Sequence, residues 1–323
     1  VTAQLAENER PLSPGMKYKH YAPQAEITIV KGSPAAFNEY VNARKSKEIG
    51  ALCFDEDLPH LHVPAVTYGS RADALTQARQ LFDALRQLDE MGIRTVYAAC
   101  PDASGVGLAV YNRLLRAAAF RIECAIHVVG LTGPTGSGKT TVADAWREQG
   151  AYIIDTDKLA RAITEPGSPC LATLAEAFTP AILNEDGSLN RPELAKRAFA
   201  TAETAQLLNS VTHPAIVALT RQEIEHAAEQ GYGVAVVDAP LLYEAKADAL
   251  CDTIVAVTAP SDVRKRRIMA RDGLTEQQAS QRMAAQHPNS FYCREGVTVL
   301  DGSGDAATLQ ASAKQLLTSL LSN

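Results

Sequence analysis

The stretch Gly133-Pro134-Thr135-Gly136-Ser137-Gly138-Lys139-Thr140 matches every position of the G-x-x-x-x-G-K-[ST] pattern of phosphate-binding loops. Residues 126–131 before it are β-branched and apolar and predict a buried strand, whereas residues 140–149 after it predict a helix. This order places backbone N–H groups and a helix N-terminus around a phosphate. The stretch therefore predicts a nucleoside triphosphate site. A chance glycine-rich turn is the alternative, and the full match in this context argues against it.

The residue types of the loop have chemical reasons. Glycines permit a positive φ and let the backbone approach phosphate oxygens closely. We expect Lys139 to reach the β- and γ-phosphates and the Thr140 hydroxyl to ligate Mg²⁺. The loop alone is shared by kinases, GTPases, motors and transporters, so the flanking sequence has to identify the reaction.

Length and composition limit the class of protein. The chain has 323 residues, enough for two ordinary domains, and its 46% apolar content is typical of a globular protein. A net charge of −6 argues against direct binding to nucleic acid. We expect no membrane span and no signal peptide, because neither pattern occurs. Six cysteines without a C-x-x-C pair predict reduced thiols in a cytoplasmic protein.

Two α/β patterns follow one another along the chain. The first has predicted strands at 26–31, 49–54 and 95–100 and predicted helices at 72–91 and 106–120. The second has predicted strands at 126–131, 152–155, 234–238, 253–257 and 297–300. Alternating strands and helices favour βαβ units with mainly parallel sheets. Residues 9–23 contain three prolines and no periodicity, which predicts an extended linker.

A long interval separates the second and third strands of the second pattern. It contains helical patterns at 192–200, 202–211 and 213–229, which predict an inserted helical subdomain. The three expected domains are an extended linker at 1–24, a smaller α/β domain at 25–122 and the phosphate-loop domain at 123–323.

Aspartates lie at or directly after the ends of two of these predicted strands. Asp155 and Asp157 follow the strand at 152–155, and Asp238 ends the strand at 234–238. Open α/β sheets bind ligands at the carboxyl ends of their strands. Such a carboxylate can accept a proton from an attacking hydroxyl or help to hold Mg²⁺, and we expect the metal role for Asp238. The alternative for each is to cap the following helix, and one of Asp155 and Asp157 can do so while the other serves the chemistry.

A basic helix is predicted at 262–272. Arg267 and Arg271 are four residues apart and fall on one face, where two guanidinium groups suit a transferring phosphoryl group. A solvated face is the alternative, especially for neighbouring basic residues. Arg282 and Gln286 continue a polar face on the next predicted helix. Together these features predict a mobile lid that closes over the phosphates and excludes water.

Residues 126–304 resemble the dephospho-CoA kinase family. The matching motifs, in order, are Gly130-Leu131-Thr132-Gly133 with Gly136-Ser137-Gly138-Lys139-Thr140-Thr141, Asp155-Thr156-Asp157 with Ala160-Arg161, Leu208-Asn209 with His213-Pro214, Pro240-Leu241-Leu242-Tyr243-Glu244, and Arg267-x-x-x-Arg271-Asp272-Gly273-Leu274 with Arg282 and Gln286. The resemblance implies transfer of the γ-phosphate of ATP to the ribose 3′-hydroxyl of dephospho-CoA, which gives coenzyme A. It also implies a P-loop nucleotide-kinase-like parallel sheet with a helical insert and a lid.

The resemblance also implies roles for individual residues. Asp157 would be the base that faces the 3′-hydroxyl, and Arg267 and Arg271 would be lid cations. The nucleotide-binding residues would be Gly133, Gly136, Ser137, Gly138, Lys139, Thr140 and Thr141, with Lys139 also in catalysis and Mg²⁺ on Thr140 and Asp238. The acceptor would contact Asp157, His213, Pro240 and Leu241. A turn that opens a helix is the alternative for His213 and Pro214.

The match has one departure near the C-terminus. The family has Ala-Asp before its last strand and Asn after it, where this chain has Gly296-Val297 and Gly302. The departure concerns contacts to adenine and leaves the residues of the phosphoryl transfer unchanged.

Residues 13–120 resemble the linker and C-terminal domain of threonylcarbamoyl-AMP synthases. The linker match is Ser13-Pro14-Gly15-Met16-Lys17-Tyr18-Lys19-His20-Tyr21-Ala22-Pro23, and the later match is Gly105-Val106-Gly107-Leu108-Ala109 with Asn112-Arg113-Leu114 and Ala117-Ala118. The resemblance implies a smaller Rossmann-like α/β domain. The family's catalytic domain lies before the linker, so a partner catalytic domain upstream or in trans is expected. A dinucleotide-binding turn at Gly105 and Gly107 is a weaker alternative, because the third glycine is missing.

Two other functions remain as alternatives to the dephospho-CoA kinase. One is a kinase for another small hydroxyl acceptor. The other is an accessory or regulatory nucleotide-binding partner in tRNA threonylcarbamoylation.

Overall fold

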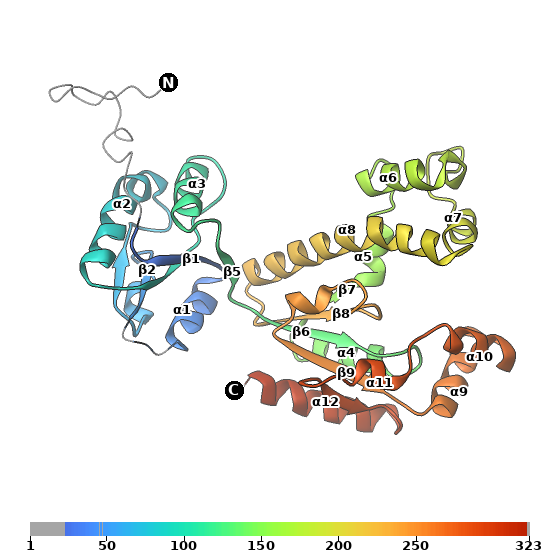
Figure 1. Ribbon diagram of the computed structural model, residues 1–323. Coiled ribbons are helices and arrows are strands. Elements are labelled where there is room, and N and C mark those ends of the chain that lie inside the picture. Colours follow the sequence, from blue (N-terminus) through green and yellow to red (C-terminus); the bar gives the residue numbers. More distant parts are fainter. Residues whose placement is uncertain (1–22, 45, 47, 322–323) are drawn as a thin grey trace. The chain divides into compact units, whose positions relative to one another are not determined.

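The structure is a computed structural model that describes residues 23–44, 46 and 48–321 (Figure 1). The chain divides into two compact units, Val1–Ala125 and Ile126–Asn323, and each is described by itself. The linker predicted at residues 1–24 lies outside the described residues except for its last two. No helix in the described part of the chain is long and apolar enough to span a bilayer.

The first unit alternates strands and helices. Its elements are β1 (Glu26–Lys31), α1 (Pro34–Asn42), β2 (Ile49–Cys53), η2 (Leu58–His60), β3 (Ala65–Thr67), α2 (Ala74–Glu90), β4 (Thr95–Ala99), α3 (Gly107–Ala117) and β5 (Ile122–Cys124). The strands form a sheet of order β3-β2-β4-β1-β5, and each described pair of neighbours is parallel. This is the parallel α/β sheet that the sequence predicted.

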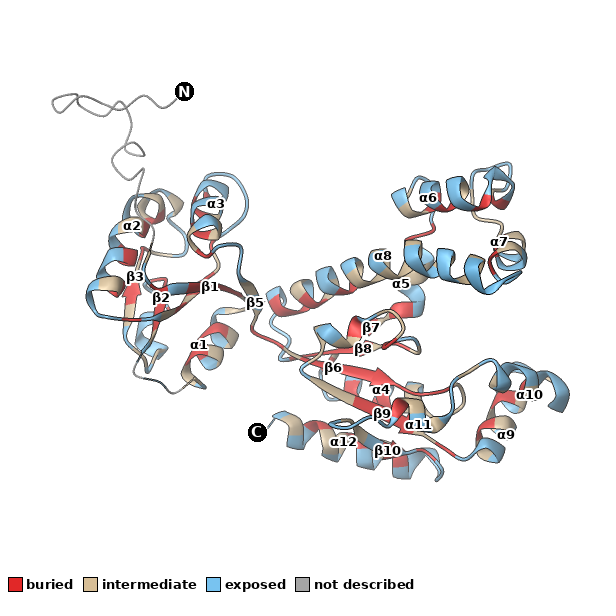
Figure 2. Cartoon of the chain, in the orientation of Figure 1, coloured by how far each residue is buried: buried red, intermediate tan, exposed pale blue. Residues whose placement is uncertain are grey.

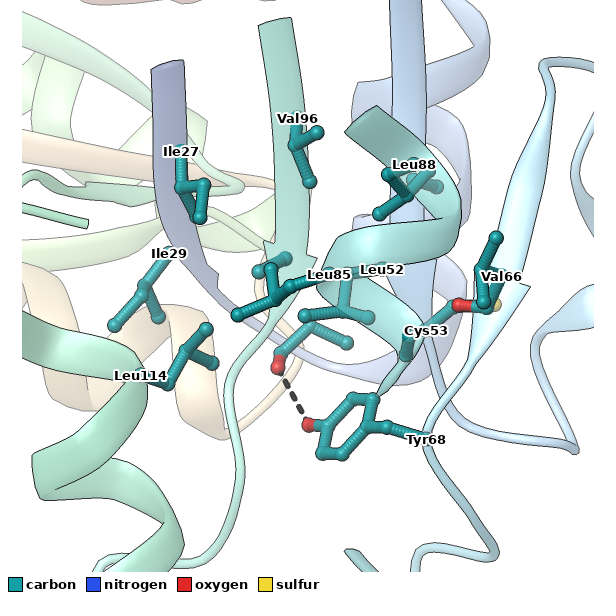
Figure 3. Packing of buried hydrophobic residues seen from close by; sticks show 14 of the residues in the cluster. Ile27, Ile29, Leu52, Cys53, Val66, Tyr68, Leu85, Leu88, Val96 and Leu114 are labelled. Carbon is teal, nitrogen blue, oxygen red and sulfur yellow. Dashed lines mark hydrogen bonds between the residues drawn. The ribbon is translucent and has the colours of Figure 1, made fainter. Parts of the chain in front are cut away.

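The core of this unit is formed by the sheet and its three α-helices, with Phe37 and Val41 contributed by α1. Leu85 and Leu88 of α2 and Leu114 of α3 point toward buried side chains of β1, β2 and β4 (Figure 3). The hydroxyl of Tyr68 donates a hydrogen bond of 2.9 Å to the carbonyl of Ala99, so this buried polar group is satisfied. Apolar side chains at helical spacing on α2 and α3 thus account for the packing.

The second unit carries the phosphate-binding stretch. Its elements are β6 (His127–Thr132), α4 (Lys139–Glu148), β7 (Tyr152–Asp155), α5 (Thr156–Ala162), α6 (Pro169–Phe178), η3 (Pro180–Ile182), α7 (Arg191–Ala198), α8 (Ala202–Glu229), β8 (Val234–Asp238), η4 (Ala247–Leu250), β9 (Thr253–Thr258), α9 (Ser261–Asp272), α10 (Glu276–Ala284), α11 (Asn289–Tyr292), β10 (Thr298–Asp301) and α12 (Ala306–Leu321). The sheet has the order β10-β9-β6-β8-β7 and its described pairs are parallel.

Burial is concentrated along the middle of this sheet. Figure 2 shows buried residues along β6 and β8, whereas α10 is mostly exposed. Helices α4 and α12 pack together over the sheet, and the indole Nε1 of Trp146 donates a bond of 2.7 Å to the carbonyl of Ala313. β6 lies between β9 and β8, so the loop that follows it is held at the centre of the carboxyl edge.

The helical insert consists of α6, α7 and the N-terminal half of α8 (Figure 1). The sequence predicted separate helices at 202–211 and 213–229, and this was wrong because α8 is continuous from Ala202 to Glu229 with Pro214 inside. Proline removes one N–H bond, here the one that Ser210 C=O would otherwise accept. Ser210 and Pro214 are both exposed, so water can satisfy the freed carbonyl and the helix continues.

Candidate active site

The phosphate-binding stretch forms the turn between β6 and α4. Gly133 has φ 136° and Gly138 has φ 112°, a backbone conformation that side chains rarely adopt. A Cβ on Gly133 would lie 2.2 Å from the carbonyl oxygen of Val257, and one on Gly138 would lie 2.6 Å from Leu309. Both glycines are therefore required by the path of the loop, which opens its N–H groups toward the N-terminus of α4.

A cavity of about 470 Å³ lies at this helix N-terminus. It is lined by Pro134, Thr135, Gly136, Gly138, Lys139, Thr140, Thr141, Arg267, Ala270 and Arg271. The cavity thus brings the loop and the two lid arginines together. Gly133 and Ser137 are not among its lining residues, and the Ser137 hydroxyl is buried without a hydrogen-bond partner among the described residues.

Lys139 lies at the first position of α4. Its Nζ donates a hydrogen bond of 2.8 Å to the carbonyl of Gly133, which holds the side chain across the loop. Burial lowers the pKa of Lys139, and the charges of Asp238 and Asp157 oppose that shift. The ammonium group therefore lies at the cavity wall, under the influence of one carboxylate that ends β8 and one in the first turn of α5.

The three carboxylates of the sequence prediction have different surroundings. The Asp155 carboxylate accepts a bond of 3.1 Å from the Lys158 N–H and caps α5, whereas Asp157 in the first turn is exposed. Burial raises the pKa of Asp238 to about 6, against the attraction of Lys139 and helped by the charges of Asp155 and Asp157. One buried carboxylate oxygen of Asp238 has no hydrogen-bond partner among the described residues.

These oxygens fit a hard divalent cation. Mg²⁺ is usually held by one or two carboxylates together with substrate phosphates and water. Asp238 offers an unpaired carboxylate oxygen and Thr140 offers an exposed hydroxyl on the cavity wall. Among the described residues no cluster of three or more His, Cys, Asp or Glu could hold a metal.

The two lid arginines have different contacts. Arg267 donates bonds of 2.7 Å to the carbonyls of both Gly302 and Gly304, in the loop after β10, and longer ones to the phosphate loop. Arg271 pairs with Asp272, which Arg282 also contacts at 2.8 Å. Arg267 is thus tied to backbone carbonyls, and Arg271 presents the more exposed guanidinium to the cavity.

Arg264 was not predicted as a site residue. Its Nε donates a bond of 3.0 Å to the carbonyl of Thr135, and its Nη2 donates one of 3.2 Å to Gln286 Oε1. Gln286 was predicted to lie on the second lid helix, which is wrong because α10 ends at Ala284. Gln286 Oε1 also accepts a bond of 3.0 Å from the N–H of Thr135. The only sequence signal for Arg264 was its place in the run of basic residues on α9. That signal does not distinguish Arg264 from the other basic residues of the run.

Gly302, one of the residues at which the chain departs from the family near the C-terminus, lies against the phosphate loop. A Cβ at this position would lie 2.0 Å from the carbonyl oxygen of Ser137 and 3.2 Å from that of Thr258. The N–H of Gly302 donates a bond of 2.7 Å to the carbonyl of Thr258. The chain after β10 therefore runs directly against the phosphate loop, and this approach requires a glycine.

The residues predicted to contact an acceptor lie outside the cavity at the phosphate loop. Asp157, His213, Pro240 and Leu241 are not among its lining residues. Pro240 and Leu241 follow β8, Leu241 is exposed, and His213 is half-buried within α8. The side chain of Thr156 donates a bond of 2.9 Å to the carbonyl of Asp238, which fixes the start of α5 against the end of β8.

Comparison with known families identifies both parts of the chain. Residues 127–308 match the family model described as dephospho-CoA kinase. Residues 1–119 match the model described as the C-terminal domain of threonylcarbamoyl-AMP synthase. Both resemblances predicted from the sequence are confirmed.

Individual relatives agree with the first match. The dephospho-CoA kinase of Corynebacterium efficiens is 44% identical over 193 residues, which is 60% of this chain and 96% of that protein. That of Anaeromyxobacter dehalogenans is 41% identical over 195 residues, with 60% and 92% covered. The crystal structure of TT1252 from Thermus thermophilus superposes with a TM-score of 0.52 at 29% identity, covering 60% of this chain and 98% of that one. This chain therefore belongs to the dephospho-CoA kinase family.

Proposed function

We propose that the chain transfers the γ-phosphate of ATP to the ribose 3′-hydroxyl of dephospho-CoA. Membership of the family is one support. The observation that carries the proposal is the juxtaposition of Lys139 in the phosphate loop with the unpaired carboxylate oxygen of Asp238. A cation over the phosphates and a free carboxylate at the strand end are the parts that phosphoryl transfer needs.

Residues of the loop and of the lid bind the phosphates and offset their negative charge. Residues 136–141 surround the phosphates, and Lys139 exchanges the Gly133 carbonyl for a phosphate oxygen when ATP binds. Arg271 offsets charge on the equatorial oxygens, while Arg267 contacts the nucleotide from its anchored position. Closure of α9 and α10 excludes water.

Thr140 and Asp238 would hold Mg²⁺ in the nucleotide site. The ion would supply positive charge that offsets the charge of the β- and γ-phosphates. The buried oxygen of Asp238 supports this assignment because it lacks any other described partner. A bound cation would favour the ionised form of Asp238, against the burial that raises the pKa of this carboxyl.

The acceptor binds beyond the phosphate cavity. Asp157 orients the 3′-hydroxyl and accepts its proton, and its exposure in the first turn of α5 leaves it accessible to the acceptor. His213, Pro240 and Leu241 contribute to the acceptor pocket, with the helical insert around it. Asp155 is taken up by its capping role, which leaves Asp157 for this one.

The first unit suggests a second, separate role. We assign residues 1–24 to a linker, 25–122 to an accessory domain and 123–323 to the kinase. The match of residues 1–119 supports an interaction with the catalytic domain of a threonylcarbamoyl-AMP synthase, upstream or in trans. We place both roles in the cytoplasm, because the six cysteines are spread along the sequence without a C-x-x-C pair.

An acceptor panel tests the kinase. The protein is incubated with ATP and Mg²⁺ and with dephospho-CoA, nucleoside monophosphates or shikimate, and the product is identified by mass and by the position of its new phosphate. We expect 3′-phosphorylation of dephospho-CoA. Turnover of another acceptor alone would favour a kinase for a different small hydroxyl compound. ATP hydrolysis that no acceptor stimulates, with tight binding to a synthase catalytic domain, would favour the accessory role.

A further inference from the structure

Arg264 is a buried cation with only neutral partners. Its side chain belongs to α9 and the residue is 5% exposed. Besides Thr135 and Gln286, its Nη1 contacts Asn289 Oδ1 at 3.4 Å. None of the ion pairs found among the described residues involves Arg264. A guanidinium keeps its charge in any protein, and a buried charge without a counter-ion is costly.

The charge of Arg264 reaches the phosphate site. Arg264 does not line the cavity, but it holds Thr135, which does. Gly136 packs on its backbone, since a Cβ there would lie 2.9 Å from the Arg264 carbonyl oxygen. Burial is the main cause of the lowered pKa of Lys139, and the charges of Arg271 and Arg264 lower it further. A bound triphosphate would supply the negative charge that the apo protein lacks there.

Gln286 is the residue that leaves this charge uncompensated. Its Oε1 accepts bonds from both the Thr135 N–H and Arg264 Nη2, and a carboxylate oxygen could accept the same two bonds. A glutamate would therefore preserve the geometry and form a buried ion pair. The neutral amide keeps the geometry and leaves the charge for a ligand.

We propose that Arg264 is a positioning residue that orients Thr135 in the phosphate loop, and that the neutral Gln286 leaves the Arg264 charge available to the triphosphate. The inference rests on the proposed function, because it assigns Arg264 to the ATP half of that site. It predicts that stability without nucleotide and affinity for nucleotide respond in opposite directions to a negative charge at position 286.

The test compares Gln286→Glu with wild type in the full chain. The melting temperature is measured without nucleotide, and the Kd values for AMP, ADP and ATP are measured by calorimetry without acceptor. We expect the melting temperature to rise by about 2–4 °C. We expect the Kd for ATP to rise by about tenfold, with a smaller change for ADP and little change for AMP. In turnover assays the KM for ATP should rise with kcat retained, as for a loss of uniform binding.

Three control variants separate the effect of charge from the effect of geometry. Gln281→Glu adds the same charge on the exposed surface of α10 and should leave all three Kd values near wild type. Gln286→Met removes both accepted bonds without adding charge, so it should lower the melting temperature and change AMP and ATP binding by the same factor. Arg264→Lys should retain most of the ATP affinity because it keeps the charge.

Three results would overturn the inference: an unchanged ATP affinity in Gln286→Glu, an equal loss for AMP and ATP in that variant, or the same loss in Gln281→Glu. Failure of the proposed function would look different. Wild-type protein would then not phosphorylate dephospho-CoA, whereas the dependence of the Gln286→Glu effect on the number of phosphates would be unchanged.

Discussion

Lys139 and Asp238 lie close enough at the carboxyl edge of the second unit's sheet for each charge to shift the pKa of the other. Burial favours the neutral form of both groups, and their mutual attraction favours the charged forms. Burial has the larger effect for Asp238, whose pKa rises from 3.8 to about 6. Without ligand, burial thus favours the neutral carboxyl of Asp238, and a bound positive charge would favour its ionised form.

The raised pKa of Asp238 predicts opposite effects of pH on stability and on activity. Between pH 3.8 and about 6 the folded state binds more protons at Asp238 than the unfolded state does, so apo stability falls as pH rises through this window. Metal binding needs the ionised carboxylate, so kcat/KM for ATP should fall as pH drops through about 6. Urea unfolding and pH–rate profiles measure the two effects.

Asp238→Asn provides the control for both effects. It keeps the shape of the side chain and removes the proton equilibrium. We expect this variant to lack the stability loss between pH 4 and 6, and to need more Mg²⁺ for turnover at pH 8. Parallel stability profiles in wild type and Asp238→Asn would mean that another group is responsible.

Asp157→Asn tests the acid–base role. Asp157 is exposed in the first turn of α5 and caps nothing, because Asp155 accepts the Lys158 N–H. The substitution should therefore leave the melting temperature within about 1 °C of wild type. We expect kcat to fall by about 10²–10⁴-fold, while the Kd for ATP stays near wild type. Near-normal turnover would remove Asp157 from this role.

Gly302→Ala tests the approach of the chain after β10 to the phosphate loop. The added Cβ would meet the carbonyl oxygen of Ser137 at 2.0 Å, and backbone must move to relieve that contact. We expect a loss of about 1–3 kcal/mol in the free energy of unfolding and a higher KM for ATP.

Gly304→Ala is the matched control for that substitution. A Cβ at this position would meet only the Thr308 side chain at 3.9–4.0 Å, which is ordinary contact. Unfolding experiments and ATP kinetics should place this variant close to wild type. Equal damage from the two substitutions would show that the loop as a whole, and not the contact with Ser137, is sensitive.

Strands with continuous apolar runs could be predicted from the sequence because the pattern is local. The predicted bounds of β1, β7 and β8 agree with the structure at both ends. Shorter or weaker elements were missed. β3 has three residues, and its position at the sheet edge comes from pairing with β2. Helix α12 could have been found, since its buried residues Leu309, Ala313 and Leu317 are four apart.

The site residues also differ in whether the sequence alone could predict them. Residues 133–140 could be assigned because their types and spacing are dictated by phosphate chemistry. Arg264 and Gly302 could not, since their importance depends on contacts with residues more than a hundred positions away in the chain. The continuity of α8 through Pro214 also required knowing that the affected turn is exposed.

Substitution of Arg267 should mainly lower stability, whereas substitution of Arg271 should mainly lower kcat. Arg267 donates to the carbonyls of Gly302 and Gly304, so Arg267→Met removes hydrogen bonds within the fold. We expect it to lower the free energy of unfolding by about 1–3 kcal/mol and to raise the KM for ATP.

Arg271 lines the cavity and pairs only with the neighbouring Asp272 among its described ion pairs, so Arg271→Met should leave stability nearly unchanged. It should lower kcat by about 10²–10³-fold, the usual cost of one lost charge-stabilising group. Thermal unfolding and steady-state kinetics on both variants measure this split. A large stability loss in Arg271→Met with normal kcat would reverse the two assignments.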